Sequence, residues 1–355
     1  MSYRLLITGG CGFIGSNLVR YLLDTEPEIR LCNLDALTYS GNPANLQDLA
    51  GHPRYRFVHG NILDRPLVEG LLRESDGVAH LAAESHVDRS ILDSRTFVES
   101  NVLGTQTLLD AARTVWGRGS GKRFLHVSTD EVYGSLPLDR PDLKFTEQSP
   151  LHTNSPYSAS KAGSDLLALA YHQTHDLNVV ITRCSNNFGP YQFPEKVIPL
   201  FVTNLLEGEP VPLYGDGLNV RDWLHVVDHC EALWRVLRDG RSGEVYNIGG
   251  NNERSNLELT RTILELLGKD ERSIRYVPDR LGHDRRYAID AGKIREEIGW
   301  EPSRSAWPGA LAKTIRWYVE HPDWWRAVRE RNRQRDLEPA EAAPAAPVAA
   351  SGQRS

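Results

Sequence analysis

The feature that most constrains this chain is the glycine-rich segment RLLITGGCGFIG, residues 4–15. An apolar run, Arg4–Thr8, precedes the glycines, and an amphipathic segment, Phe13–Asp24, follows them. The spacing is GxxGxxG, formed by Gly9, Gly12 and Gly15. Glycines at this spacing allow a tight turn and close packing of a helix on the preceding strand. The segment therefore predicts a strand–turn–helix unit at the start of the fold.

Strand-like and helix-like segments alternate through the first half of the chain. Further strands are predicted at Arg30–Leu34, Tyr55–His59, Gly77–Ala82, Arg123–Ser128 and Asn178–Arg183. Further helices are predicted at Arg65–Glu74, Thr96–Val115 and Tyr157–His175. Apolar strands that alternate with helices are typical of a parallel sheet covered on both faces, and right-handed crossovers make it doubly wound. The predicted fold class is α/β, with a doubly wound parallel sheet of Rossmann type.

The pattern changes after about residue 186, where turn-rich pieces separate shorter elements. We expect residues 1–185 to form the sheet domain, with return segments near residues 223–250 that include a strand at Val245–Ile248. Residues 186–330 should form a smaller, mixed C-terminal substrate domain. Residues 334–355 are rich in alanine and proline without apolar periodicity, which predicts a disordered tail.

Composition excludes several classes of function. The chain has 355 residues and a net charge of -6, so bulk charge indicates neither a nucleic-acid nor a membrane-surface partner. No apolar run is long enough to span a bilayer, and the N-terminus lacks a signal-peptide pattern. The four cysteines are scattered and form no CxxC pair, which favours a reducing cytoplasm. His225 and His229 have the spacing of a zinc pair, but no third ligand is suitably spaced, so no metal is expected.

The glycine turn and a later carboxylate together predict a dinucleotide site. A helix N-terminus offers free N–H groups and a partial positive charge to phosphates. Asp35 ends the second predicted strand, 20 residues after Gly15. A carboxylate there can bind both ribose hydroxyls of NAD and would repel the 2′-phosphate of NADP. The predicted cofactor is NAD.

A tyrosine and a lysine lie one helical turn apart in SPYSASKAGSD, residues 155–165. Tyr157 and Lys161 are at positions i and i+4, on one face of the predicted helix. An ammonium beside a phenol favours the phenolate, so we expect Lys161 to lower the pKa of Tyr157. Tyr157 could then accept a proton from a sugar hydroxyl as hydride leaves for the nicotinamide. Lys161 could also bind the nicotinamide ribose.

The segment STDEVYG, residues 128–134, has two adjacent carboxylates directly after a predicted buried strand. Neighbouring residues of a strand point to opposite faces. Asp130 and Glu131 can therefore reach one substrate only if the strand has ended and the chain is turning, which Gly134 supports. Two carboxylates close together raise the pKa of one of them, and this would keep Asp130 protonated near neutral pH.

These segments resemble the extended short-chain dehydrogenase/reductases and, within them, the dTDP-glucose 4,6-dehydratases. The resemblance runs from about Tyr3 to about His321. It is carried by TGGCGFIGSNLVRYLL, NLDALTYSGNPANL, HLAAESHVDRSI, STDEVYG, YSASKAGSD, CSNNFGPYQFPEKVIPL, PLYGDGLNVRDWLHVVDH and DRLGHDRRYAID. STDEVYG is the most specific of them, since related epimerases lack the adjacent Asp–Glu pair. The resemblance implies conversion of dTDP-glucose to dTDP-4-keto-6-deoxyglucose, with NAD retained.

The resemblance assigns a role to each residue of the catalytic segment. It implies that Tyr157 is the base at the C4 hydroxyl and that Thr129 hydrogen-bonds the C4 oxygen. Glu131 would remove the C5 proton, and Asp130 would protonate the departing C6 hydroxyl. Oxidation at C4 makes this elimination feasible, because C5–H then lies next to a carbonyl.

The resemblance also implies binding residues and a dimer. Besides the glycines, the cofactor residues would be Phe13, Ile14, Asp35, Ala36, Leu37, Thr38, Asn61, Ile62, Leu81, Ala82, Ala83, Ser85, Ser100, Tyr157, Lys161 and Asn187. The substrate residues would be Ser85, Thr129, Asn186, Lys196, Val197, Pro212, Tyr214, Arg221, Asn256, Arg280 and His283. The cations among them suit a diphosphate, and Tyr214 suits stacking on a pyrimidine. The helices at Thr96–Val115 and from Tyr157 would pair across a two-fold axis in a homodimer.

Two departures from the family pattern and several alternatives remain. Asn61 stands where the family commonly has Asp, and Leu281 where Pro is usual. Another nucleotide-sugar enzyme of this fold is the main alternative: a UDP-glucose 4,6-dehydratase, a 4-epimerase or a UDP-glucuronate decarboxylase. The Asp130–Glu131 pair argues against the last two. A non-catalytic NAD-sensing protein is a further alternative, although such proteins can lose the tyrosine and lysine that this chain keeps.

Overall fold

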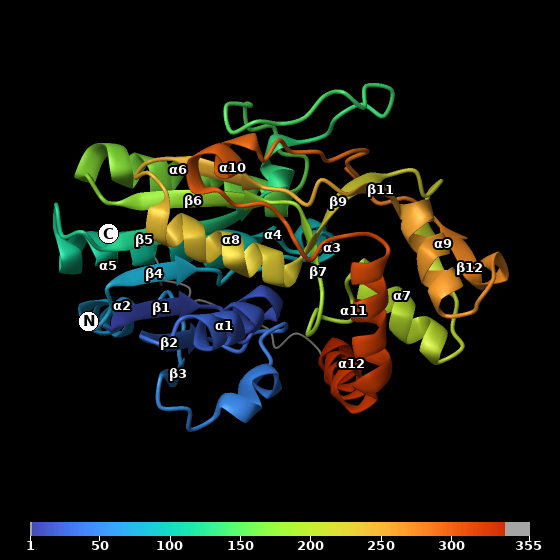
Figure 1. Ribbon diagram of the computed structural model, residues 1–355, viewed down its shortest axis with the longest axis horizontal. Helices are drawn as coiled ribbons and strands as arrows, with labels where there is room; N and C mark the ends of the chain where they lie inside the picture. The colour runs from blue at the N-terminus through green and yellow to red at the C-terminus, as the bar shows by residue number, and fades with distance from the viewer. Residues whose placement is uncertain (1, 338–355) are drawn as a thin grey trace, which may run out of the picture.

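A seven-stranded parallel sheet forms the centre of the molecule (Figure 1). The computed structural model describes residues 2–337. The strands are β1 (Tyr3–Thr8), β2 (Ile29–Asp35), β3 (Tyr55–His59), β4 (Gly77–His80), β5 (Arg123–Thr129), β6 (Val179–Cys184) and β10 (Val245–Ile248). Their order is β10-β6-β5-β4-β1-β2-β3, with every pair parallel. The doubly wound fold predicted from the sequence is confirmed.

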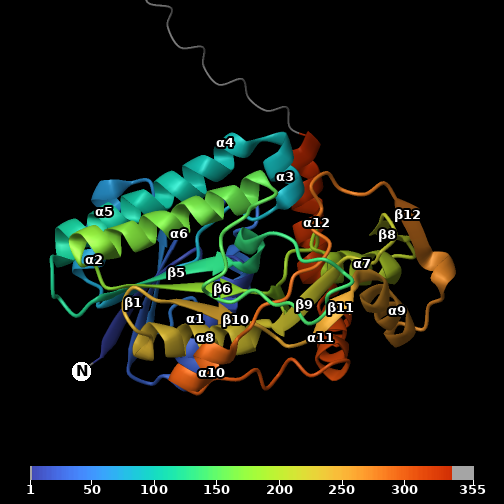
Figure 2. The ribbon, with the colours of Figure 1, turned by 90° about the horizontal axis from the view of Figure 1, so that it is seen from above.

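Helices cover both faces of this sheet, as Figure 2 shows. One face carries α1 (Phe13–Thr25), α8 (Val226–Asp239) and α10 (Gly292–Ile298), whose apolar side chains form one hydrophobic cluster with the sheet. The other face carries α2 (Arg65–Arg73), α5 (Gly104–Trp116) and α6 (Pro156–His175), which form a second cluster. The buried strands have apolar residues on both faces because each face packs on helices.

A helix covers the predicted segment Thr96–Val115, but it contains a π-helical turn. After the short helix α3 (Val87–Leu92), α4 (Ser94–Phe97) continues through the π-helical turn η2 (Val98–Leu103) into α5, with helical backbone angles at each junction. Asn101 lies buried in the π turn, where its amide donates to the Glu84 carbonyl at 3.0 Å and to Ser160 Oγ at 2.8 Å. The wider turn aims this polar side chain inward, which a regular helical pattern does not predict.

Smaller elements pack beside the carboxyl ends of the main strands. A mixed sheet contains β11 (Glu253–Ser255), β9 (Val220–His225) and β7 (Asn186–Phe188), and β8 (Val211–Tyr214) pairs with β12 (Ile274–Val277). The helices here are α7 (Val197–Leu206), α9 (Asn256–Leu266), α11 (Gly309–Glu320) and α12 (Pro322–Leu337), and the short 3₁₀ turns of the chain are η1 (Pro43–Leu49), η3 (Asp130–Tyr133) and η4 (Glu271–Ser273). A third hydrophobic cluster joins these helices. The division of the chain at residue 186 stays a prediction.

The last described helix overlaps the start of the predicted tail. Helix α12 continues to Leu337, so residues 334–337 are helical. The rest of that tail, residues 338–355, lies outside the described residues. Among residues 2–337, no helix is long and apolar enough to cross a membrane.

Two glycines of the first turn are required by close backbone contacts. Gly9 has a positive φ of 75°, and a Cβ there would lie 2.7 Å from the Ala82 backbone nitrogen. A Cβ on Gly15 would overlap the Gly9 carbonyl oxygen. The first turn of α1 therefore packs directly on the end of β1, as the glycine spacing predicts.

We expect Gly15→Ala to lower the free energy of unfolding by about 1–3 kcal/mol, because the added methyl group overpacks this contact. Gly70→Ala is the matched control, since Gly70 lies inside α2 and a Cβ there meets no atom within 4 Å. That change should stabilise the protein by roughly 0.5–1 kcal/mol through helix propensity. Urea unfolding measures both. Equal effects of the two changes would contradict the packing role of Gly15.

Candidate active site

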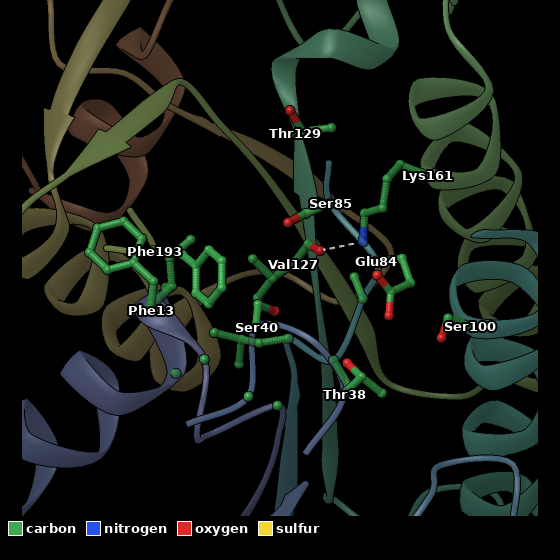
Figure 3. Close-up of a pocket in the computed structure, with 18 of the residues that line it drawn as sticks. Phe13, Thr38, Ser40, Glu84, Ser85, Ser100, Val127, Thr129, Lys161 and Phe193 are labelled. Carbon is green, nitrogen blue, oxygen red and sulfur yellow. Dashed lines mark hydrogen bonds between the residues drawn. The ribbon is translucent and has the colours of Figure 1, made fainter. Parts of the chain in front are cut away.

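A cavity of about 300 Å³ lies at the carboxyl ends of the central strands (Figure 3). It lies where the strand order reverses, because β1 has β2 on one side and β4 on the other. Ligands of doubly wound sheets bind at this position. Every cofactor residue predicted from the sequence lines the cavity except Leu37, whose backbone N–H instead bonds Asp35.

The glycine turn and Asp35 form one end of this cavity. Asp35 is the last residue of β2, and its carboxylate accepts hydrogen bonds from the backbone N–H groups of Cys11 and Leu37, both at 2.8 Å. Burial raises the pKa of Asp35, and the two N–H groups oppose that shift. No side chain caps the N-terminus of α1 at Gly12. A fixed carboxylate beside an uncapped helix N-terminus fits the ribose and the pyrophosphate of a dinucleotide.

Tyr157 and Lys161 enter the cavity from the first turns of α6. Ser155 caps this helix through a reciprocal pair of hydrogen bonds with Ser158. Lys161 Nζ donates to the Val127 carbonyl at 2.8 Å, the contact drawn as a dashed line in Figure 3. Burial lowers the pKa of Lys161 to about 8.

The expectation that Lys161 lowers the pKa of Tyr157 is wrong for this arrangement. Burial raises the pKa of Tyr157 well above its usual value, and the negative charge of Glu131 adds to the shift. The lysine ammonium bonds a backbone carbonyl of β5 and not the phenol. The phenol of Tyr157 therefore keeps its proton in this arrangement and can donate a hydrogen bond.

Asp130 and Glu131 lie on a turn and not on a strand. Strand β5 ends at Thr129, and the chain then forms the 3₁₀ turn η3. Thr129 Oγ1 accepts from the Glu131 N–H at 3.3 Å, and Gly134 ends the turn with a φ of 87°. Both carboxylates line the same cavity. The condition set by the sequence, that the strand must have ended before the pair, is met.

The surroundings of the two carboxylates differ. The pKa of Asp130 is raised well above its usual value, first by burial and then by the charges of Glu131 and Asp222. Burial also raises the pKa of Glu131, but the positive charges of Arg221, Lys196 and Arg280 oppose this. Asp130 Oδ2 makes no hydrogen bond with any other described residue. The pair therefore combines a protonated acid with a carboxyl that nearby cations help to ionise.

The predicted substrate residues divide into two groups. Ser85, Thr129, Asn186 and Lys196 line the cavity. The others lie outside its lining: Val197, Pro212, Tyr214, Arg221, Asn256, Arg280 and His283. Three of these form a cluster of their own, because the Arg280 guanidinium lies 5.6 Å and the His283 ring 6.1 Å from the Tyr214 ring centroid. The binding roles of both groups stay predictions.

Sequence reasoning missed one wall of the cavity. Tyr39, Ser40, Gln192 and Phe193 line it, although none was predicted. Tyr39 and Phe193 pack with Val328 of α12, and Trp324 Nε1 donates to Asn45 Oδ1 at 2.9 Å. These contacts join residues almost 300 positions apart, and no local pattern marks them.

His225 and His229 have other partners. The His225 ring caps the N-terminus of α8 through the Val227 N–H, and His229 Nδ1 lies 2.9 Å from Asn187 Oδ1. Within residues 2–337, no three or more His, Cys, Asp or Glu side chains are grouped to hold a metal ion.

Known proteins match this chain over most of its length. Residues 6–309 match the family described as GDP-mannose 4,6 dehydratase. The dTDP-glucose 4,6-dehydratases of Actinoplanes sp. and Streptomyces griseus are each 54% identical to the chain, covering 91% and 92% of it and 99% and 98% of their own lengths. The chain belongs to the dTDP-glucose 4,6-dehydratase family.

Solved structures of this family agree with the fold. The dTDP-glucose 4,6-dehydratase DesIV from Streptomyces venezuelae, solved with NAD bound, has a TM-score of 0.87 and 55% identity, covering 92% of this chain and 99% of its own. A UDP-glucose 4-epimerase from Thermotoga maritima has a TM-score of 0.80 at 28% identity, covering 89% of this chain and 99% of its own. The dehydratase family and the epimerases share one architecture.

We expect Asp130→Asn to raise the melting temperature at pH 8. The folded protein holds this proton at pH values where the unfolded chain has lost it, so stability falls as the pH rises above the ordinary pKa of aspartate. The amide removes this penalty, and the difference between variant and parent should shrink as the pH falls toward about 4. Thermal unfolding across this pH range measures it.

Asp48→Asn is the control with the opposite sign. Arg20 holds the pKa of the Asp48 carboxyl below its usual value, so this change should destabilise slightly at neutral pH and have less effect in acid. An Asp130→Asn protein that melts below the parent at pH 8 would show that Asp130 is ionised and stabilising.

Proposed function

We propose that this chain is a dTDP-glucose 4,6-dehydratase, which converts dTDP-glucose to dTDP-4-keto-6-deoxyglucose and water and retains NAD through the cycle. One observation carries the proposal: Asp130 and Glu131 are adjacent on a 3₁₀ turn and line the same cavity as Tyr157. An elimination across C5–C6 needs a base and an acid at neighbouring carbons, in reach of the site that oxidises C4.

The residues around the cavity suit NAD as the resident cofactor. Asp35 would hold the ribose hydroxyls, and the N-terminus of α1 would face the pyrophosphate. The chemistry that NAD supplies when bound is acceptance of hydride from C4 and its return at C6. Lys161 is buried, and its ammonium is already oriented toward the carboxyl end of β5.

Tyr157 and Thr129 would act at the C4 oxygen. The raised pKa makes Tyr157 a proton donor at rest, and positive charge entering the cavity would favour its phenolate. The phenolate then accepts the C4 hydroxyl proton, and the Thr129 hydroxyl holds the same oxygen.

Glu131 and Asp130 would carry out the elimination. The C4 ketone makes the C5 proton removable, and Glu131, ionised with the help of three nearby cations, accepts it. Asp130 keeps its proton by burial and donates it to the C6 hydroxyl, which leaves as water. After hydride return to C6, Glu131 can give its proton back to C5. Tyr157 then releases the C4 hydroxyl proton to solvent, and Asp130 recovers a proton from solvent.

Other nucleotide-sugar reactions explain this site less well. A 4-epimerase needs only the oxidation and reduction at C4, so the Asp130–Glu131 pair would have no task. A non-catalytic NAD-sensing role does not need Tyr157 and Lys161 in the cavity, where both are found. A 4,6-dehydratase acting on a UDP-sugar would use the same residues. An assay with both nucleotide sugars distinguishes thymine from uracil.

Substrate deuterated at C4 tests the proposal. We expect the deuterium at C6 of the keto-deoxy product, because hydride stays within the site throughout the cycle. Mass spectrometry or NMR locates the label, and parallel incubations compare dTDP-glucose with UDP-glucose. Deuterium released to solvent or to free cofactor would contradict the proposal. Equal turnover of dTDP-glucose and UDP-glucose would contradict the proposed preference for thymine.

We also propose that the chain forms a homodimer through α5 and α6. Figure 2 shows these helices side by side along one side of the molecule. Apolar side chains are exposed there: Leu166 of α6 is 58% exposed, and Leu103 and Val98 of η2 are 48% and 47% exposed. These exposed apolar side chains support association through this surface, which would remove them from water.

We expect Leu166→Glu to shift the protein from dimer to monomer, because it would bury a carboxylate in the proposed contact. Leu266→Glu on α9 is the control and should leave the dimer intact, since α9 lies at the other end of the molecule (Figure 1). Sedimentation measures the mass of each protein. A parent that is monomeric, or a Leu166→Glu variant that stays dimeric, would contradict this interface.

A further inference from the structure

We propose that Asp165, Arg183 and Tyr133 form a positioning chain that holds the acid–base turn η3 in register with the catalytic helix α6. The inference rests on the proposed function, because it concerns how the oxidising and eliminating groups of one site are kept aligned. None of the three residues lines the cavity. They lie behind it, between the elements that do.

The positioning chain begins at Asp165, on the catalytic helix itself. Asp165 lies one turn beyond Lys161 and two turns beyond Tyr157, on the same side of α6. Its side chain is fully buried, and its Oδ2 accepts a hydrogen bond from Arg183 Nε at 2.8 Å. Its Oδ1 lies 3.2 Å from His126 Nε2. The helix that presents Tyr157 and Lys161 is thus attached to β6 by a buried ion pair.

The positioning chain ends at Tyr133, on the turn that carries the two carboxylates. Arg183 Nη1 donates to the Tyr133 hydroxyl at 2.9 Å, and that hydroxyl donates to Asn247 Oδ1 of β10 at 2.8 Å. Tyr133 is the last residue of η3, two positions after Glu131. Its ring stacks on Phe145, with centroids 5.2 Å apart, and packs in one cluster with Ala162 of α6. The phenol is therefore fixed on every side.

A buried ion pair is a poor way to gain stability, because desolvation offsets most of the attraction. It does define geometry, since the N–H groups of a guanidinium donate hydrogen bonds only in fixed directions. The proposed reaction demands such definition. Tyr157 and Glu131 act on adjacent carbons, yet they belong to elements 26 residues apart in the chain. The path Asp165–Arg183–Tyr133 is a direct polar link between these elements.

Tyr133→Phe tests the link with little change in volume. The ring contacts stay, whereas the hydrogen bonds to Arg183 and Asn247 are lost. We expect C5 exchange with deuterated solvent and water loss to slow by roughly 10- to 100-fold, as for a small displacement of a catalytic group. Oxidation at C4 should continue, so the absorbance of reduced nicotinamide should rise during turnover. The fall should be in kcat, with KM for dTDP-glucose nearly unchanged.

Tyr246→Phe is the matched control. Tyr246 is another fully buried tyrosine, and its hydroxyl donates to Glu297 Oε2 at 2.8 Å, away from the cavity lining. It should lose some thermal stability and keep the parent's exchange rate and nicotinamide absorbance. A merely structural role for Tyr133 predicts the same behaviour in both variants, which would overturn the inference.

The outcomes separate this inference from the proposed function. A parent enzyme that shows no C5 exchange with dTDP-glucose would overturn the proposed function and the inference with it. A parent that exchanges normally, beside a Tyr133→Phe variant that exchanges equally fast, would overturn the inference alone. Slow exchange with raised nicotinamide absorbance in Tyr133→Phe, and in Tyr133→Phe only, supports it.

Discussion

The parallel arrangement of the seven strands is the constraint on which the rest of the site depends. In a parallel sheet covered by helices, the strands are apolar along their length, and polar side chains gather where the strands end. Asp35 ends β2, Thr129 ends β5, and Cys184 ends β6, all at the same edge. Residues far apart in the chain thus line one cavity, at the position where the strand order reverses.

Burial at that edge sets the protonation of the site. The same exclusion of water raises the pKa of Asp130 and Tyr157 and lowers that of Lys161, so burial shifts each of them toward its neutral form. Charge then distinguishes the two neighbouring carboxylates. Neighbouring carboxylates add to the raised pKa of Asp130, whereas arginines and a lysine oppose the rise at Glu131. Two similar side chains, one position apart, thus differ in the charges that act on their protonation.

The sequence predicted those features of the fold that depend on local pattern. Strands Tyr55–His59 and Val245–Ile248 have the predicted bounds, and the glycine turn lies where its spacing places it. The π turn at Val98–Leu103 escaped prediction because Asn101 is drawn inward by Glu84 and Ser160, which are distant in sequence.

Interactions that span the chain were beyond prediction for the same reason. The pKa of Tyr157 was expected to fall because helical spacing puts Lys161 beside it, but spacing does not reveal that the ammonium bonds the Val127 carbonyl. Within the candidate site, the residues that follow a motif were found, and those supplied by loops such as Tyr39 and Phe193 were not.

The packing of α12 has a consequence for how the protein is made. Val328 and Trp324 support the loop that contains Tyr39 and Asn45, which leaves the ribosome early in synthesis. A nascent chain lacks this support until α12 has been translated. This wall of the cavity therefore cannot form before α12 has been made, so a translation product truncated before α12 would bear the glycine turn and Asp35 without the packing behind Tyr39 and Phe193.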